Sequence, residues 1–201
     1  MKKPVAIVLH GPSGVGKDTL IDILRQRIDI HRPTSTTSRP PRRDEAQGTH
    51  YHFVTPEEFL DKVERGDFVE RALVYGDLKG LERDELEHPL AKGRDIVIRT
   101  DVQGARRWRE LLEGAVFVFV AAENEDALRQ RLAGRETEDE ETIERRIAVL
   151  EDELADMPNN DYVVVNRSHK ADEAVSELID IIETERTNTE RPKPRLRLPQ
   201  G

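Results

Sequence analysis

A glycine-rich turn at residues 11–19, Gly-Pro-Ser-Gly-Val-Gly-Lys-Asp-Thr, constrains the fold of this chain more than any other feature. An apolar run at residues 5–9 leads into the turn, and a helical pattern begins directly after it. In this setting the glycines let successive backbone N–H groups point inward, and the helix presents its positive end to an anion. The segment therefore predicts a cradle for the phosphates of a nucleoside triphosphate, with Lys17 reaching the outer phosphates.

Apolar runs alternate with helical patterns along most of the chain. The runs lie at residues 5–9, 95–98, 116–120 and 162–165, and the helical patterns at residues 18–28, 103–112, 125–132 and 170–185. Alternation of this kind predicts an α/β fold in which helices cover both faces of a parallel sheet, giving three layers.

Three segments depart from this rhythm. Residues 34–93 are interpreted as a small mixed α+β insertion, with short strands at 51–54 and 68–74 around a helix at 56–65. Residues 130–148 carry an acidic stretch flanked by arginines, which is typical of a mobile helical lid. Residues 188–201 are rich in Pro and Arg and are predicted to form a disordered tail. The core then consists of residues 1–33 and 94–187.

Composition limits the classes of partner. The chain has 201 residues, a net charge of −9 and no cysteine. An acidic balance argues against nucleic acid and membrane surfaces as partners and favours small molecules. Without cysteine, neither disulfides nor thiolate metal sites can form. No apolar run approaches the ~20 residues needed to cross a bilayer, so we expect a cytoplasmic protein, either a monomer or a homodimer.

An irregular segment at residues 35–42, Ser-Thr-Thr-Ser-Arg-Pro-Pro-Arg, is the candidate site for a second anion. Arg39 and Arg42 are three residues apart in a loop stiffened by proline, so both guanidinium groups can converge on one small anion. Tyr51 can add a hydroxyl donor, and a monophosphate fits this arrangement. The alternative is a surface loop whose arginines pair with Asp44 and Glu45.

Several sequence motifs together resemble the guanylate kinase family. They are GPSGVGK, STTSRPPR, GTHYHFVTPEEF, GDFVERA, DVQGA, RLAGRETEDEETIERRI and VVVN, in the family's order and spacing between residues 5 and 185. The resemblance implies a P-loop kinase that transfers the terminal phosphoryl group of ATP to GMP, with the insertion binding the acceptor. Such transfer depends on alignment of the two nucleotides and on positive charge around the transferring group, and a lid with arginines supplies both.

The resemblance also implies which residues serve each nucleotide. On the donor side they are Gly11, Ser13, Gly14, Val15, Gly16, Lys17, Asp18, Thr19 and, near the adenine, Asn166. On the acceptor side Ser35 and Glu70 contact guanine, with Asp101 beside them, and the monophosphate contacts are Arg39, Arg42 and Tyr51. The charges around the transferring group come from Lys17, Arg39, Arg131, Arg135 and Arg146. Glu70 suits guanine because a carboxylate can accept hydrogen bonds from both N1–H and the exocyclic amine. The alternative interpretation of Glu70 is an exposed carboxylate at the end of a strand.

Four positions differ from the family pattern. Lys79 replaces a tyrosine that binds the monophosphate, which a lysine can do as a point charge, and Leu81 replaces a serine that contacts guanine. Arg99 stands where the family has an acidic residue, and Asp18 stands where a serine or threonine ordinarily holds magnesium. We expect Mg²⁺ as the cofactor that accompanies ATP. Asp18 then has two alternative roles: it ligates the metal as a hard oxygen donor, or it pairs with Arg99.

Two other functions are alternatives to a guanylate kinase. The Gly-Lys-Asp form of the loop also resembles ribose 1,5-bisphosphate phosphokinases, whose acceptor is a different phosphorylated compound. The third interpretation is a non-catalytic module of guanylate kinase type that binds proteins. Such modules generally lose the phosphate loop, whereas Lys17 and its glycines are intact here.

Overall fold

The computed structural model describes residues 2–74, 76–124, 128 and 152–197. The chain divides into two compact units, of which the smaller comprises Arg32–Lys92 and the larger comprises the residues on either side. Among the described residues, no helix has the length and apolar character that crossing a membrane requires.

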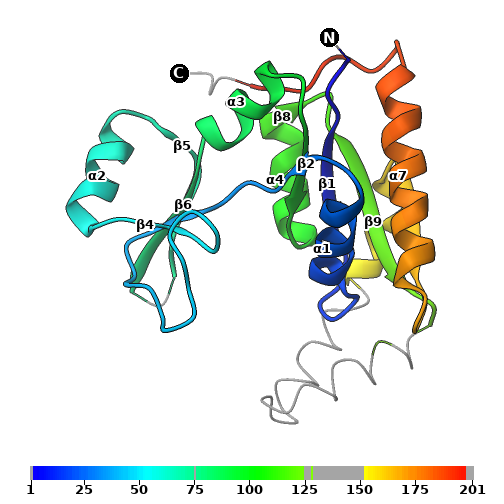
Figure 1. The fold of residues 1–201 in the computed structure, drawn as a ribbon, viewed down its shortest axis with the longest axis horizontal. Helices are drawn as coiled ribbons and strands as arrows, with labels where there is room; N and C mark the ends of the chain where they lie inside the picture. Colours follow the sequence, from blue (N-terminus) through cyan, green and yellow to red (C-terminus); the bar gives the residue numbers. More distant parts are fainter. Residues whose placement is uncertain (1, 75, 125–127, 129–151, 198–201) are drawn as a thin grey trace. The chain divides into compact units, whose positions relative to one another are not determined.

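The larger unit is built on a five-stranded parallel sheet in the order β10-β9-β1-β7-β2, of which β1, β2 and β9 are labelled in Figure 1. Its strands are β1 Ala6–His10, β2 Ile30–His31, β7 Asp95–Arg99, β9 Val116–Ala122 and β10 Tyr162–Asn166. The central strand β1 is buried at every residue. A strand covered on both faces must be apolar throughout, which is why the sequence shows an uninterrupted apolar run there.

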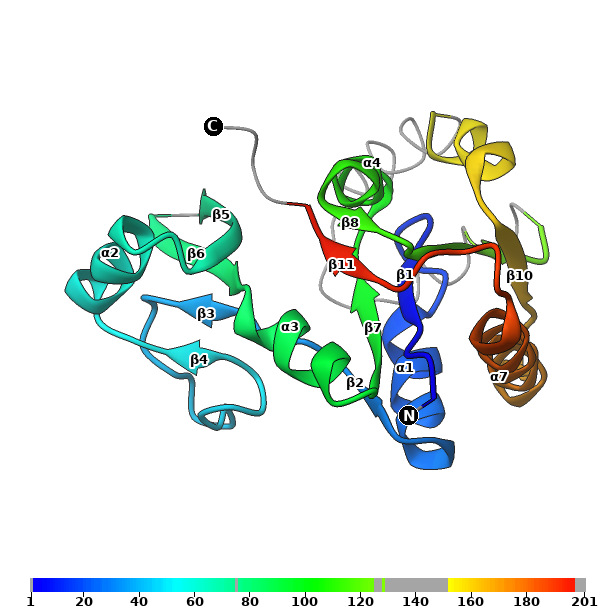
Figure 2. The same ribbon diagram turned by 90° about the horizontal axis from the view of Figure 1, so that it is seen from above.

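Helices cover both faces of this sheet, as the alternating sequence pattern predicts. α1 (Lys17–Arg27) and α7 (Ala171–Thr187) lie on one face, and α4 (Val102–Leu111) lies on the other (Figure 2). The apolar sides of α1 and α7 pack with the sheet in one core cluster, to which Leu24, Leu178 and Leu9 belong. A short 3₁₀ helix at Met157–Asn159 precedes β10. The three-layer α/β prediction is confirmed.

The smaller unit contains a mixed four-stranded sheet in the order β4-β3-β6-β5. Its elements are β3 Thr36–Thr37, β4 His52–Phe53, α2 Pro56–Glu64, β5 Phe68–Val74, β6 Asp77–Glu82 and α3 Asp84–Ala91. β3 and β4 are parallel, whereas β6 is antiparallel to both β3 and β5. α2 begins at a capping box formed by Thr55 and Glu58, and Phe59 stacks on Phe68 with ring centroids 4.4 Å apart.

A β-bulge in β5 decides which way two of its side chains face. The pairing of β5 with β6 shifts between Phe68, opposite Glu82, and Glu70, opposite Leu81. In a regular strand, residues two apart share a face, but the extra residue of a bulge reverses that relation. Phe68 therefore faces α2, while Glu70 shares the other face with Leu81.

The sequence predicted a disordered tail, and the structure differs from that prediction. Residues 188–197 follow a defined path, and β11 (Arg195–Leu196) pairs antiparallel with β8 (Leu112–Glu113). The composition rule fails here because the few side chains of this segment have specific partners in the core. Residues 198–201 lie outside the described part of the chain.

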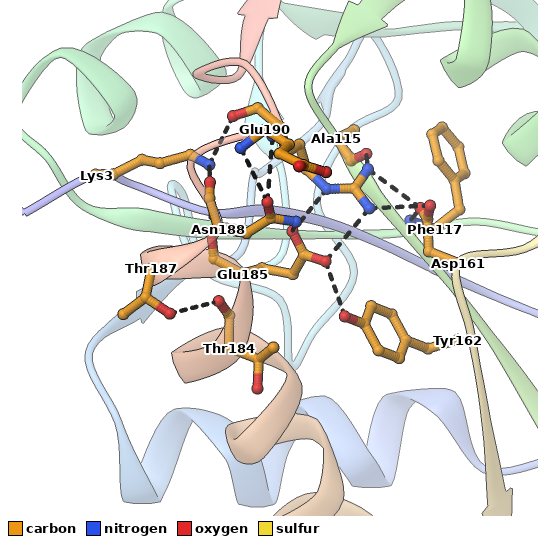
Figure 3. Close-up of polar contacts among 11 residues, drawn as sticks. Lys3, Ala115, Phe117, Asp161, Tyr162, Thr184, Glu185, Thr187, Asn188 and Glu190 are labelled. Carbon is orange, nitrogen blue, oxygen red and sulfur yellow. Dashed lines mark hydrogen bonds and ion pairs between the residues drawn. The ribbon is translucent and has the colours of Figure 1, made fainter.

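Arg191 is the centre of the contacts that hold the tail. Its guanidinium group bonds Glu185 at 2.7 Å, Asp161 at 2.9 Å and the Ala115 carbonyl at 2.9 Å. The Glu185 carboxylate also accepts from the Tyr162 hydroxyl at 2.8 Å (Figure 3). Burial alone raises the pKa of Glu185, but the hydrogen bonds from Arg191 and Tyr162 outweigh it, so the pKa is lowered and the carboxylate stays charged.

Lys3 joins the other end of the chain to the same tail. Its ammonium group donates to the backbone carbonyls of Asn188, at 2.6 Å, and Arg191, at 2.8 Å (Figure 3). Lys3 Nζ also donates to the Glu185 carbonyl at 3.3 Å, in the last turn of α7, where carbonyls lack a helical N–H partner. The contacts of Lys3 and Arg191 form what we call the tail clasp.

Candidate active site

The phosphate loop connects β1 to α1 at the carboxyl edge of the parallel sheet. The turn begins at Gly11, whose φ of 135° is accessible chiefly to glycine. A Cβ atom at Gly11 would lie 2.3 Å from the Val120 carbonyl oxygen, so any side chain would force β1 and β9 apart. The loop ends at Gly16, the N-cap of α1, with a φ of 90°.

Lys17 sits inside the loop with its ammonium group turned back on the backbone. Nζ donates to the carbonyls of Gly11, at 2.6 Å, and Pro12, at 2.9 Å, and the residue is only 7% exposed. Burial, and next the positive charge of Arg99, lower the pKa of Lys17 from 10.5 to about 8, and the nearby carboxylates oppose this effect only in part. An anionic phosphate would relieve the cost of burying this cation.

Asp18 and Arg99 form an ion pair beside the loop. Arg99 ends β7, and its guanidinium nitrogen lies 2.9 Å from Asp18 Oδ2 in the first turn of α1. Both side chains are about half exposed. The structure thus contains the pairing that was one of the two predicted roles of Asp18. Among the described residues there is no cluster of three or more potential metal ligands.

Two predicted site residues support the backbone of this region. Asn166, at the end of β10, donates from Nδ2 to the Val15 carbonyl at 2.7 Å and leaves no room for a Cβ atom at Gly16. Asp101 is the N-cap of α4 and accepts from the Gly104 amide at 2.7 Å. Both therefore have structural tasks, whatever they contact in a nucleotide complex.

Glu153 is a loop neighbour that the sequence did not indicate. It lies in a helical turn at residues 152–155, close to Lys17 and Asp101, and its carboxylate accepts from the Ser13 backbone. Burial raises the pKa of Glu153, an effect that the nearby Lys17 opposes. In the sequence this residue is one of several acidic positions in a row, so no local signal distinguishes it.

Of the cations predicted to bind an anion in the smaller unit, Arg39 and Lys79 lie near the Tyr51 ring, whereas the described contacts of Arg42 are made by its backbone. The Arg39 guanidinium lies 5.6 Å from the centroid of Tyr51, and Lys79 Nζ lies 5.5 Å from the same centroid. Arg39 is also held by both carboxylate oxygens of Glu45, at 2.8 and 2.9 Å, and the Arg42 backbone amide bonds the same carboxylate. Hydrogen bonds from Arg39, and then from the Arg42 amide, lower the pKa of Glu45 to about 2.

These contacts contain elements of both interpretations of residues 35–42. Arg39 pairs with Glu45, as the surface-loop alternative predicts. Arg39 and Lys79 also lie beside the Tyr51 phenol, and this combination of groups suits an anion site. Glu45 thus orients the Arg39 fork beside Tyr51.

Two of the residues predicted to lie at the base, Ser35 and Glu70, fall in one row with Leu81, whereas Asp101 caps α4 in the larger unit. Glu70 is directly opposite Leu81, and Thr36 is directly opposite Gly80, so one further step of the same register brings Ser35 beside Leu81. Residues directly opposite each other in antiparallel strands share a face. Leu81 is only 6% exposed, so the middle of this row is apolar where the family has a hydroxyl group.

Part of the predicted site lies outside the described residues. This applies to the lid at residues 130–148 and to its arginines, Arg131, Arg135 and Arg146.

The parallel sheet and the phosphate loop with its inward lysine define a P-loop nucleoside-triphosphate-binding protein. Comparison with known proteins narrows that class. The family model described as guanylate kinase matches residues 2–185, and the chain belongs to the guanylate kinase family.

Individual relatives agree with this assignment. The chain is 43% identical to guanylate kinase 2, chloroplastic/mitochondrial, of Oryza sativa subsp. japonica, covering 94% of this chain and 67% of that protein. It is 38% identical to the guanylate kinase of Syntrophomonas wolfei, covering 92% and 94% of the two chains. The crystal structure of guanylate kinase from Anaplasma phagocytophilum superimposes with a TM-score of 0.66 at 28% identity, over 95% of this chain and 90% of that one. The alternative functions are not favoured.

Proposed function

We propose that this chain transfers the terminal phosphoryl group of ATP to GMP, giving ADP and GDP. The observation that carries the proposal is the intact phosphate loop with the buried ammonium group of Lys17, in a chain that belongs to the guanylate kinase family. Phosphoryl transfer requires little covalent chemistry from the protein, so fixed positive charge and alignment of the reactants account for most of the catalysis.

The two nucleotides have separate binding residues in this proposal. The phosphate loop holds the donor, and Arg39, Arg42, Tyr51 and Lys79 hold the monophosphate of the acceptor. Guanine lies along the row that contains Glu70 and Leu81. The lid arginines complete the positive charge around the transferring group.

Mg²⁺ fits the donor set around the loop. Magnesium keeps several waters and is commonly bound through one or two carboxylates plus substrate phosphates, and Asp18 supplies one carboxylate in the first turn of α1. When bound, the ion would neutralise charge on the phosphates. We propose that Asp18 is its protein ligand and that Arg99 holds this carboxylate in place.

The acceptor is tested by offering a set of phosphorylated compounds. Purified protein with ATP and Mg²⁺ receives GMP, dGMP, AMP, UMP, CMP or ribose 1,5-bisphosphate in parallel, and ADP release is measured for each. We expect the largest kcat/KM with GMP. A preference for ribose 1,5-bisphosphate would overturn the proposed acceptor, and absence of ATP binding would favour the protein-binding module.

Replacing Glu70 with glutamine is expected to raise the KM for GMP by about 10- to 100-fold, because a hydrogen bond to a charged group contributes about 1.5–3 kcal/mol. The KM for ATP should stay close to its wild-type value, because Glu70 is assigned to the acceptor and not to the donor. Arg71→Gln, at the next, exposed position of β5, is the matched control. Equal changes in both KM values would contradict a role in base recognition.

Replacing Asp18 with alanine is expected to shift the Mg²⁺ dependence of the rate to higher concentration by at least about tenfold, since even residues that only orient metal ligands contribute about 10- to 100-fold to metal affinity. ATP binding without metal should be little changed. Arg99→Ala, measured in parallel, separates loss of the ligand from loss of its partner. A normal Mg²⁺ titration of Asp18→Ala would show that the residue serves only the ion pair.

A further inference from the structure

His10 is a buried polar residue directly beneath the phosphate loop. It is the last residue of β1, it is fully buried, and Gly11 follows it. Its ring meets Phe119 edge-on, with centroids 5.4 Å apart. Its Nε2 atom lies 2.6 Å from Oδ1 of Asn160, a residue 150 positions away in the chain. Neither the proposed mechanism nor the sequence motifs use this residue.

The partners of Asn160 determine which atom of the pair donates. Asn160 Nδ2 donates to the carbonyls of Asp156, at 2.8 Å, and Met157, at 3.3 Å. Its Oδ1 accepts from Arg109 at 2.7 Å, so this oxygen can only act as an acceptor toward His10 as well. The His10 ring must therefore carry its proton on Nε2. The bond runs from His10 Nε2–H to Asn160.

The remaining ring nitrogen is consistent with a neutral imidazole. His10 Nδ1 has no hydrogen-bond partner within the described part of the chain. Burial lowers the pKa of His10; Asn160 and Asp156 oppose this effect, whereas Arg109 and Lys17 reinforce it. An unpaired acceptor costs less in a buried site than an unpaired charge. The ring is thus a neutral donor with one defined orientation.

His10 directly precedes the backbone segment that holds Lys17. The carbonyls of Gly11 and Pro12, the first two residues after His10, accept both hydrogen bonds from Lys17 Nζ. On its other side, Gly11 is pressed against the Val120 carbonyl. The backbone that leaves β1 is therefore confined by β9 on one side and by the anchored imidazole directly before it.

We propose that His10 is a positioning residue of the phosphate loop: its hydrogen bond to Asn160 fixes the Gly11 and Pro12 carbonyls and hence the place of Lys17. This role rests on the proposed kinase function for its kinetic consequence. Its effect on ATP binding does not depend on which acceptor the enzyme uses. Small displacements of a binding group can cost up to about 100-fold in rate, so loss of this bond should be measurable.

The test compares three substitutions at His10. Leucine keeps most of the volume without a donor. Glutamine places an amide nitrogen near the position of Nε2, and asparagine is too short to reach Asn160. We expect His10→Leu and His10→Asn to raise the Kd and KM for ATP by about tenfold with the KM for GMP within twofold. His10→Gln should restore most of the affinity.

Three outcomes would overturn the role of His10. They are an unchanged Kd for ATP in folded His10→Leu, equal changes in the KM values of ATP and GMP, and a glutamine variant no better than asparagine. If the leucine variant does not fold, the difference in ATP affinity between His10→Gln and His10→Asn still tests the role of His10. Calorimetric titration of ATP keeps this test separate from the acceptor, since a wild-type enzyme inactive on GMP would refute only the proposed function.

Discussion

Replacing Lys17 with methionine is expected to lower kcat by about 100- to 1,000-fold, the usual loss when one preorganised donor to a developing charge is removed. Lys17 is buried among loop carbonyls, and α1 starts at this residue. Its ammonium group therefore needs no reorganisation beyond the exchange of two carbonyls for phosphate oxygens. Steady-state ADP formation with saturating ATP and GMP measures the effect.

The control for Lys17 is the same substitution at Lys170. That residue is exposed and pairs with Glu173 one helical turn away, a contact of the kind that contributes little. Lys170→Met should have the wild-type rate. A Lys17→Met variant with the wild-type rate and the wild-type unfolding curve would mean that the donor site lies elsewhere.

Replacing Arg191 with methionine is expected to lower the free energy of unfolding by about 3 kcal/mol, the low end of the loss seen when one partner of a buried ion pair is removed. The reason is Glu185, which is 3% exposed and would lose its charged partner. Tyr162 and Asn188 can still donate to Glu185, which limits the loss. Urea denaturation followed by circular dichroism measures it.

Arg195 offers a matched comparison in the same tail. Its ion pair with Glu113 resembles that of Arg191 in distance, but its side chain is 75% exposed. Arg195→Met should therefore cost no more than about 1 kcal/mol. A chain ending at residue 187 lacks both arginines and should be at least as unstable as Arg191→Met. Equal, small losses in all three variants would show that the tail clasp does not stabilise the core.

The larger unit could be predicted well because its signals are local. The strands of the parallel sheet are covered on both faces, so each appears as an apolar run, and the helix after the phosphate loop follows from its glycines and its periodicity. In the smaller unit, β6 was not predicted. Its sequence, Asp-Leu-Lys-Gly-Leu-Glu, is polar and contains a glycine, and it becomes a strand because β3 and β5 pair with it on either side.

The residues of the candidate site could be named from the sequence, but their geometry could be foreseen only in part. The sequence predicted that Arg39 and Arg42 converge on one anion beside Tyr51, whereas folding brings Arg39 and Lys79 to the Tyr51 ring. It left two roles open for Asp18, and the structure contains its pair with Arg99. The face on which the Glu70 side chain lies depends on the bulge in β5. The sequence of β5 gives no sign of this bulge, because the strand contains neither glycine nor proline.

The sequence alone determined the class of fold, the phosphate loop and the family, because each depends on residues close together in the chain. Only the tertiary structure decided which distant groups share a partly buried polar contact: His10 with Asn160, Lys3 with the Asn188 carbonyl, and Arg191 with the Ala115 carbonyl. A buried polar group must find a partner wherever the fold provides one. Which partner a polar group finds depends on the packing of the whole unit. The composition of the tail therefore could not predict that residues 188–197 would be ordered.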